Sequence, residues 1–276
     1  MEHRKYINKA LRFIDRHEFG RAYEMFSFFV DSFHDAQSLS NMGVFLNRFG
    51  DCLEEDISTV RRRAREFLLR ANKTAENART ALELAGICSD EEKYERSAAL
   101  YGRAIEILPS GFSQMRAVYN NIGADFYMLN DFSRAAECFS KALGENPFGD
   151  GQTANIADAL MFSLCRVGKY ADAGAVLEKM LGERDYEISP DTVILCYITD
   201  RGVQLCGLGG ELEYYDLDRP EYAAAKSILF GEMSSDMQSR IRCIENYSYR
   251  PQEMFICNFY GCRKHGTSLE LLAKKC

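Results

Sequence analysis

The stretch from residue 116 to residue 149, RAVYNNIGADFYMLNDFSRAAECFSKALGENPFG, decides the fold class of this chain. Its apolar and small residues recur at helical spacing and indicate two antiparallel helices. Pro147 comes just after the second helix, which it could not continue. Small residues at Gly123 and Ala135 would let the two helix axes approach closely. Bulky residues would fill the space around that contact, namely Tyr119, Phe126 and Phe139.

The same pattern recurs before and after this stretch. The aromatic residue at position 17 of this stretch returns at Tyr94, Phe132 and Tyr170, with a spacing of 38 residues both times. An earlier copy of the pattern is carried by Tyr6, Ala10, Phe13, Phe19, Ala22 and Phe26. On these residues the chain resembles the tetratricopeptide repeat family, clearly in three units and in a fourth at the N-terminus. The resemblance covers about two thirds of the chain.

The resemblance implies an all-α fold, a right-handed superhelix of stacked antiparallel helix pairs. We expect a repeat array over residues 1–186, with units near 3–33, 36–70, 78–111, 116–149 and 154–186. Elongated helices are expected over 51–70 and 72–87. Residues 187–276 are expected to be a C-terminal helical segment, either degenerate repeats or a cap. Its helices are predicted over 189–205, 220–231 and 234–246, with another short helix beginning at Pro251.

Composition excludes several classes of protein. With 46% hydrophobic and 27% charged residues among 276, the chain can build a core and is not disordered by composition. A net charge of −7 argues against wrapping nucleic acid with the whole surface. No segment resembles a signal peptide or a membrane span, so we expect a cytoplasmic protein with no nucleic-acid or membrane partner.

Catalytic motifs are missing from the sequence. Gly207–Gly210 lacks the Lys and the spacing of a phosphate-binding loop. Four scattered His residues support no pairing of a nucleophile with a base. We therefore expect no enzyme activity and no cofactor.

One set of residues near the C-terminus has the donor types of a zinc site: Cys257, Cys262, His265 and Cys276. Its spacing matches no standard zinc finger, so we expect no metal and leave this set as a weak candidate. The chain has ten cysteines in all, and most are interpreted as small buried hydrophobic residues.

The family resemblance points to a concave groove lined by the first helix of each pair. The residues expected to bind a protein or an extended peptide there are Asn120, Asn121, Tyr127, Asn155, Asp158, Phe162 and Arg166. Asn side chains can bind the amides of a peptide backbone bidentately, and aromatic anchors often dominate affinity. We expect these groove residues to be only partly buried.

One subtype of the family can be excluded. Tetratricopeptide domains that capture chaperone C-termini resemble one another in a carboxylate clamp of Lys, Asn and Arg residues. The corresponding positions here are Leu82, Gly86, Asn121, Asn155 and Ala159. Only Asn121 matches, which would leave a terminal carboxylate without cationic partners.

The leading hypothesis is a non-enzymatic scaffold or adaptor that uses the groove. Two alternatives stay open: a regulatory module that responds to a peptide signal, and a zinc-bearing accessory protein. A rival surface for an acidic partner is the basic run Arg61–Arg65, although a solvated helix face explains that run better.

Overall fold

The computed structural model describes residues 2–145, 151–183, 188–201, 212 and 214–260. Within these residues every regular element is a helix, and successive helices pack as antiparallel pairs. The predicted all-α class of stacked helix pairs is confirmed. The described residues form two compact units: residues 2–118 with 255–260 (unit 1) and residues 119–254 (unit 2).

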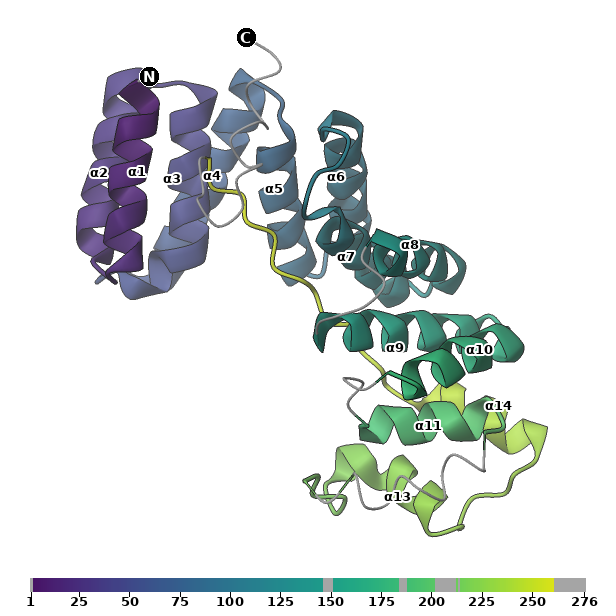
Figure 1. The fold of residues 1–276 in the computed structure, drawn as a ribbon. Coiled ribbons are helices and arrows are strands. Elements are labelled where there is room, and N and C mark those ends of the chain that lie inside the picture. Colours follow the sequence, from purple (N-terminus) through teal and green to yellow (C-terminus); the bar gives the residue numbers. More distant parts are fainter. Residues whose placement is uncertain (1, 146–150, 184–187, 202–211, 213, 261–276) are drawn as a thin grey trace. The chain divides into compact units, whose positions relative to one another are not determined.

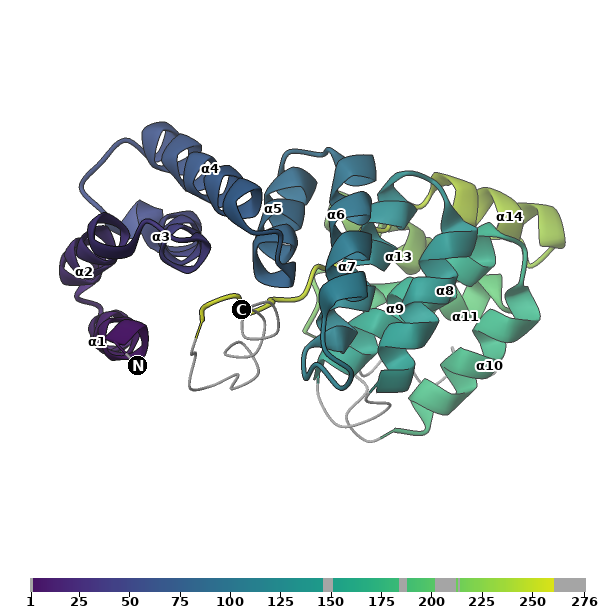
Figure 2. The ribbon, with the colours of Figure 1, turned by 90° about the horizontal axis from the view of Figure 1, so that it is seen from above.

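Unit 1 contains three helix pairs. They are α1 (Glu2–Asp15) with α2 (Phe19–Phe33), α3 (Ala36–Phe49) with α4 (Ile57–Thr74), and α5 (Ala78–Asp90) with α6 (Tyr94–Ile107). A short 3-10 turn, η1 (Gly50–Cys52), separates α3 from α4. Buried aromatic residues such as Phe26 and Phe45, whose ring centroids lie 5.1 Å apart, fill the core between the first two pairs. Figure 2 shows α5 and α6 side by side.

Unit 2 contains most of α7 (Met115–Met128), then α8 (Phe132–Glu145), α9 (Gly151–Arg166) and α10 (Tyr170–Leu181). These are followed by α11 (Pro190–Ile198), the 3-10 turn η2 (Pro220–Tyr222), α13 (Ala223–Leu229) and α14 (Met237–Asn246). α9 packs against α8 and α10, and α11 packs against α13 and α14 (Figure 1).

Four of the turns within helix pairs share one backbone feature. A residue with positive φ precedes the first residue of the second helix by two positions, at His17, Glu92, Asn130 and Gly168. The last three are again spaced by 38 residues. A left-handed residue ends the first helix and reverses the chain, and Gly and Asn adopt that conformation at low cost.

Small residues do bring the helices of a pair together, although the contact around Gly123 differs from the prediction. In the third pair the hydroxyl of Ser97 donates a hydrogen bond to the carbonyl of Ala85 at 2.9 Å, so these two small residues meet directly. In the fourth pair a Cβ added at Gly123 would lie 2.8 Å from the ring of Phe139, not first against Ala135. Gly123 therefore makes room for a fully buried aromatic ring.

The elongated helices predicted over 51–70 and 72–87 are wrong at their starts. α4 begins only at Ile57, because Asp56 caps it by accepting the backbone N–H of Thr59 at 2.9 Å. The chain then leaves the helix after Thr74, and Asn77 caps α5 by accepting the N–H of Thr80 at 3.0 Å. Capping by these two short polar side chains outweighed the helical pattern that continues through them.

Two C-terminal helix predictions are also corrected. Ser189 and Pro190 do begin a helix, with Ser189 as the cap, but α11 ends at Ile198 rather than near residue 205. Residues 202–211 lie outside the described part of the chain. The short helix predicted from Pro251 is absent, since residues 247–259 contain no helix. The regions 220–231 and 234–246 do contain helices, α13 and α14.

Candidate peptide-binding groove

Five of the seven predicted groove residues contact the chain's own residues 247–254, namely Asn120, Asn121, Tyr127, Phe162 and Arg166. Residues 247–254, together with 255–260 in unit 1, form a stretch without helical turns that we call the C-terminal segment (Figure 1). After Tyr247, whose N–H still bonds to the carbonyl of Cys243 in α14, the backbone groups of the segment need partners outside a helix. Side chains from the first helices of the repeats supply them.

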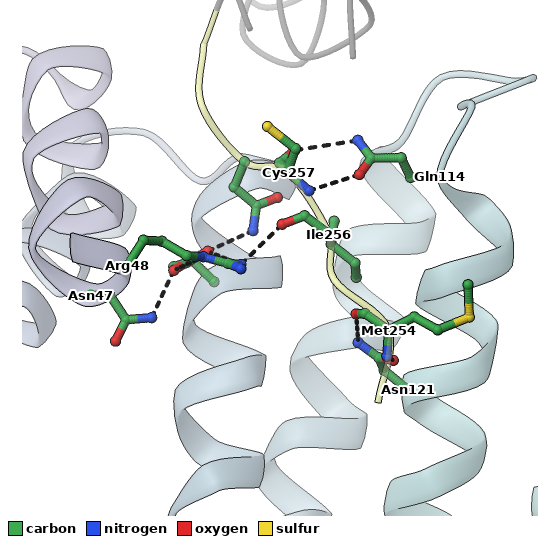
Figure 3. A network of polar contacts seen from close by, with 9 residues as sticks. Asn47, Arg48, Gln114, Asn121, Met254, Ile256 and Cys257 are labelled. Carbon is green, nitrogen blue, oxygen red and sulfur yellow. Dashed lines mark hydrogen bonds and ion pairs between the residues drawn. The ribbon is translucent and has the colours of Figure 1, made fainter. Parts of the chain in front are cut away.

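Two neighbouring asparagines of α7 bind the backbone of residues 252–254. The side-chain amide of Asn120 donates to the carbonyl of Gln252 at 2.8 Å. Asn121 pairs with both main-chain groups of Met254: its Nδ2 donates to the carbonyl at 3.0 Å, and its Oδ1 accepts the N–H at 2.7 Å (Figure 3). This is the bidentate recognition of a peptide backbone that an Asn amide permits.

Aromatic rings hold the preceding residues. The ring of Tyr249 stacks on Phe162 of α9 with a centroid distance of 4.1 Å and an interplanar angle of 18°. Tyr247 stacks on Phe162 at 5.5 Å, and Tyr127 of α7 meets Tyr249 edge-on at 5.7 Å. Offset stacking and edge-to-face contacts of this kind stabilise aromatic pairs beyond the area that they bury.

Arg166, at the end of α9, binds the backbone where α14 ends and the segment begins. Its Nη2 donates to the carbonyl of Tyr247 at 2.9 Å and its Nη1 to the carbonyl of Glu245 at 3.3 Å. The guanidinium also lies over the ring of Phe132 at 5.3 Å. A cation at the last carbonyls of a helix is favourable because those groups have no intrahelical donor.

The expectation that the groove residues are only partly buried is wrong for most of them. Phe162 is 0% exposed and Asn120 is 1% exposed, and Asn121, Tyr127 and Asp158 are also buried. Asn155 is half-buried. Residues 247–254 cover the face of α7 and α9 that the sequence pattern indicated as open to a partner.

A half-buried acid supports the aromatic part of the site. The hydroxyl of Tyr247 donates to Asp191, which lies in the first turn of α11. Burial raises the pKa of Asp191, and the hydrogen bond from Tyr247 opposes that rise. Burial and the neighbouring Asp191 raise the pKa of the Tyr247 hydroxyl. The tyrosine therefore stays protonated and available as a donor.

In unit 1 a second amide pairs with both main-chain groups of one residue. Gln114 accepts the N–H of Cys257 at 2.7 Å and donates to its carbonyl at 3.3 Å (Figure 3). The sequence pattern did not indicate Gln114, because this residue lies before the repeat stretch that begins at residue 116.

Charged groups hold the rest of residues 255–260. Arg48 of α3 forms a bidentate ion pair with Glu83 of α5 at 3.0 and 3.1 Å and donates to the carbonyl of Ile256 at 3.0 Å. Glu83 also accepts from the side chains of Asn258 and Asn47, at 2.7 and 2.8 Å. The side chain of Glu83 is only 1% exposed, so these four donors replace the water that the carboxylate loses.

A fully buried arginine lies near the end of the described segment. Arg79 donates to Asn41 at 2.9 Å, and the same Asn41 oxygen accepts the N–H of Tyr260 at 3.2 Å. The guanidinium lies 5.6 Å from the centroid of the Tyr260 ring, and burial lowers the pKa of Arg79. Phe259 stacks between Phe26 and Phe49 at about equal distances, 6.1 and 6.0 Å.

Sequence reasoning missed these residues of unit 1. The signal available for them was a charged residue, Glu83, inside the apolar run 81–85, since an acid in such a run needs a buried partner. Which residues would supply that partner is not readable from spacing, because Arg48 and Asn258 are 35 and 175 residues away.

The remaining predicted sites are less well defined. Of the weak zinc candidates only Cys257 is described, and it is buried; Cys262, His265 and Cys276 lie outside the described residues. Seven cysteines are described as free thiols and five of these are buried, as expected of small hydrophobic residues. In the basic run, Arg63 pairs with Glu55 and Arg65 pairs with Glu91 at 2.9 Å, while Arg62 is exposed.

Among the described residues, no three His, Cys, Asp or Glu side chains are grouped so that they could hold a metal ion. No helix within the same residues combines the length and the apolar character needed to span a bilayer.

Comparison with known proteins supports the fold. No protein-family profile matches the chain, and no curated protein sequence does either. Its structure is similar to that of PilF from Pseudomonas aeruginosa, with a TM-score of 0.61 and 17% identity over 82% of this chain and 97% of PilF. It is also similar to MamA (AMB-1), with a TM-score of 0.51 and 21% identity over 68% of this chain and 94% of MamA. Both are tetratricopeptide-containing proteins, so the fold is tetratricopeptide-like.

Proposed function

We propose that this protein is a non-enzymatic interaction scaffold that binds an extended polypeptide segment on the face of α7 and α9 in unit 2. The observation that carries the proposal is the pairing of Asn121 with both main-chain groups of Met254, at 3.0 and 2.7 Å. This contact recognises backbone and not a particular side chain, so a partner segment can make it as well as residue 254 does. The tetratricopeptide-like fold of PilF and MamA supports the same class of function.

The chain's own residues 247–254 are the reference ligand for this face. A tethered ligand has an effective concentration in the millimolar range, so it competes strongly with a free peptide. Weakening the tethered copy is therefore the way to expose the site. Met254→Pro removes the N–H that donates to Asn121, and proline is compatible with an extended backbone.

The test measures binding of a fluorescein-labelled synthetic peptide with the sequence of residues 246–255, NYSYRPQEMF, to the full-length Met254→Pro protein. Fluorescence anisotropy is expected to show saturable binding, tighter than to the unmodified protein. Adding Asn121→Ala should weaken it by about tenfold, from roughly 1–2 kcal/mol per truncated anchor. Gln152→Ala, an exposed change on α9, is the matched control and should leave the affinity unchanged.

Absence of peptide binding to a Met254→Pro protein that keeps its helical circular dichroism would refute the proposal. Equal binding by the Asn121→Ala and Gln152→Ala proteins would move the interaction surface away from α7.

A second candidate is a regulatory module, favoured by the occupation of the face by residues 247–254. In that case the C-terminal segment alternates between a bound and a released state as a partner binds. Hydrogen exchange at the Met254 amide tests this function: added peptide should accelerate exchange in the unmodified protein.

A further inference from the structure

The contacts in unit 2 have a regular register along α7. Tyr127 meets Tyr249, and Asn120 binds the carbonyl of Gln252. These helix positions are seven residues apart, which corresponds to about 10 Å of helix. The segment positions are three residues apart, which corresponds to about 10 Å of extended chain. Between these two contacts helix and segment stay in step when they run in opposite directions, whereas Asn121 reaches Met254, two residues beyond the position that Asn120 binds.

The same match holds along α9. Phe162 stacks on Tyr249, and Arg166 binds the carbonyl of Tyr247. Four helical residues span about 6 Å, and two extended residues span about 6.6 Å. One turn of helix therefore matches two residues of the segment. Residues two apart in an extended chain point to the same side, so both tyrosine rings stack on Phe162.

The side chains between these anchors contribute less. Ser248, Arg250 and Gln252 are exposed, whereas Tyr247 and Tyr249 are half-buried against aromatic rings. At Gln252 only the carbonyl is bound by Asn120. Pro251 is buried and Met254 packs against the unit 2 core, but only the two tyrosines stack on aromatic rings, and backbone recognition lies in residues 252 and 254.

We propose that unit 2 selects an extended partner segment with two aromatic side chains two residues apart, and that this segment displaces residues 247–254 by repeating their register. In the chain's own segment the second aromatic residue is Tyr249. It lies three residues before Gln252, whose carbonyl is bound by Asn120, and five residues before Met254, whose backbone is bound by Asn121. The inference rests on the proposed function and names the class of partner for the same face. Two aromatic rings give specificity because each fills a defined position, whereas the backbone contacts accept most residues.

The experiment compares variants of the NYSYRPQEMF peptide in the full-length Met254→Pro protein. Replacing the residue that corresponds to Tyr249 with Ala should weaken binding about tenfold or more, because it removes the ring that contacts both Phe162 and Tyr127. The Ala variant at Tyr247 should lose about threefold to tenfold, since that ring stacks at the longer distance. The matched control is Ala at Gln252, where only the backbone is bound, and its affinity should not change.

Register is tested by one inserted Ser after the residue that corresponds to Arg250. The insertion keeps both aromatic side chains and all backbone groups, but it shifts them by one residue relative to each other. Affinity is expected to fall about tenfold or more, because an extended chain advances about 3.3 Å per residue and turns its alternate face to the helices. Unchanged affinity of the inserted peptide overturns the register.

A second measurement uses the unmodified protein, so that the result does not depend on folding of the Met254→Pro variant. A peptide with benzoylphenylalanine in place of Tyr249 is irradiated with the full chain and the crosslinked residue is mapped. Crosslinking within 127–132 or 158–166 supports the register, and crosslinking elsewhere overturns it. If the parent peptide binds but its alanine variants bind equally well, the aromatic rule fails while the scaffold stands; if the parent peptide does not bind, the proposed function itself fails.

Discussion

The two halves of the C-terminal segment are bound by different chemistry. Residues 247–254 are held in unit 2 mainly by stacked rings and neutral amides, principally Phe162 and Asn121, with Arg166 on the carbonyl of Tyr247. Residues 255–260 are held in unit 1 mainly by charged groups, the ion pair of Arg48 with the buried Glu83 and the buried Arg79, together with the amide of Gln114. Neutral contacts can be exchanged for equivalent ones from another peptide, whereas a buried charge that loses its partner is strongly destabilising. The comparison indicates that residues 247–254, bound in unit 2, are the half of the segment that a partner can replace. Residues 255–260, bound in unit 1, are the anchored half.

The largest expected effect is in unit 1, at the buried carboxylate. Glu83→Ala leaves Arg48 without its ion-pair partner and Asn258 without its acceptor. We expect a loss of about 3–5 kcal/mol in the free energy of unfolding, measured by urea denaturation followed by circular dichroism. The control is Glu91→Ala, which removes the more exposed pairs with Arg65 and Lys93 and should cost less than about 1 kcal/mol. Similar losses in the two variants would contradict the anchored role of unit 1.

The next effect concerns the packing of α7 against α8 in unit 2. Gly123→Leu drives a side chain into the ring of Phe139, where even a Cβ would lie at 2.8 Å. Overpacking should reduce the melting temperature through a loss of roughly 1–3 kcal/mol or more. At Gly144, on the exposed face of α8, a Cβ has open space, so Gly144→Ala should be neutral or slightly stabilising. An unchanged melting temperature for Gly123→Leu would show that the α7–α8 packing is misassigned.

The two amides that pair with the segment backbone provide a matched test across the halves. Asn121→Asp and Gln114→Glu each replace an N–H donor with an oxygen that faces a carbonyl. Each should cost about 1–3 kcal/mol, because a buried carbonyl loses its donor. Hydrogen exchange is expected to accelerate at Met254 in the first variant and at Cys257 in the second. If the Met254 amide of the Asn121→Asp variant exchanged as slowly as in the unmodified protein, the identification of residues 247–254 as the exchangeable half would be wrong.

The smallest expected effect is a pH dependence confined to the aromatic half. Burial raises the pKa of Asp191, so the folded state retains this proton to a higher pH than the unfolded state does. Stability from this group is fully present below the ordinary pKa and is lost as pH rises through the folded value. Asp191→Asn should therefore gain stability relative to the unmodified protein as the pH rises above about 4, the ordinary pKa of an Asp side chain. Parallel unfolding curves for the two proteins across that range would contradict the shift.

Much of the helical pairing could be predicted because each repeat carries its own pattern. The recurring aromatic residues Tyr94, Phe132 and Tyr170 each begin the second helix of a pair. Errors arose where a local cap competed with helical periodicity, as at Asn77. The short helix predicted from Pro251 is wrong for a related reason, because proline is tolerated both in the first turn of a helix and in an extended chain. The backbone that follows Pro251 is held in extended form by two side chains distant in sequence. Asn120 binds the carbonyl of Gln252, and Asn121 binds the N–H of Met254.

The sequence by itself determined the helix pairs and the residue types on their inner faces, because periodicity and the small residues at helix contacts act over a few neighbouring positions. It also indicated Asn120, Asn121, Tyr127, Phe162 and Arg166 as residues suited to an extended peptide. Only the tertiary structure decided that residues 247–254 lie on that face and that Glu83 meets both Arg48 and Asn258. Such contacts join positions tens to hundreds of residues apart, and their partners depend on how the whole chain returns on itself, which no local pattern specifies.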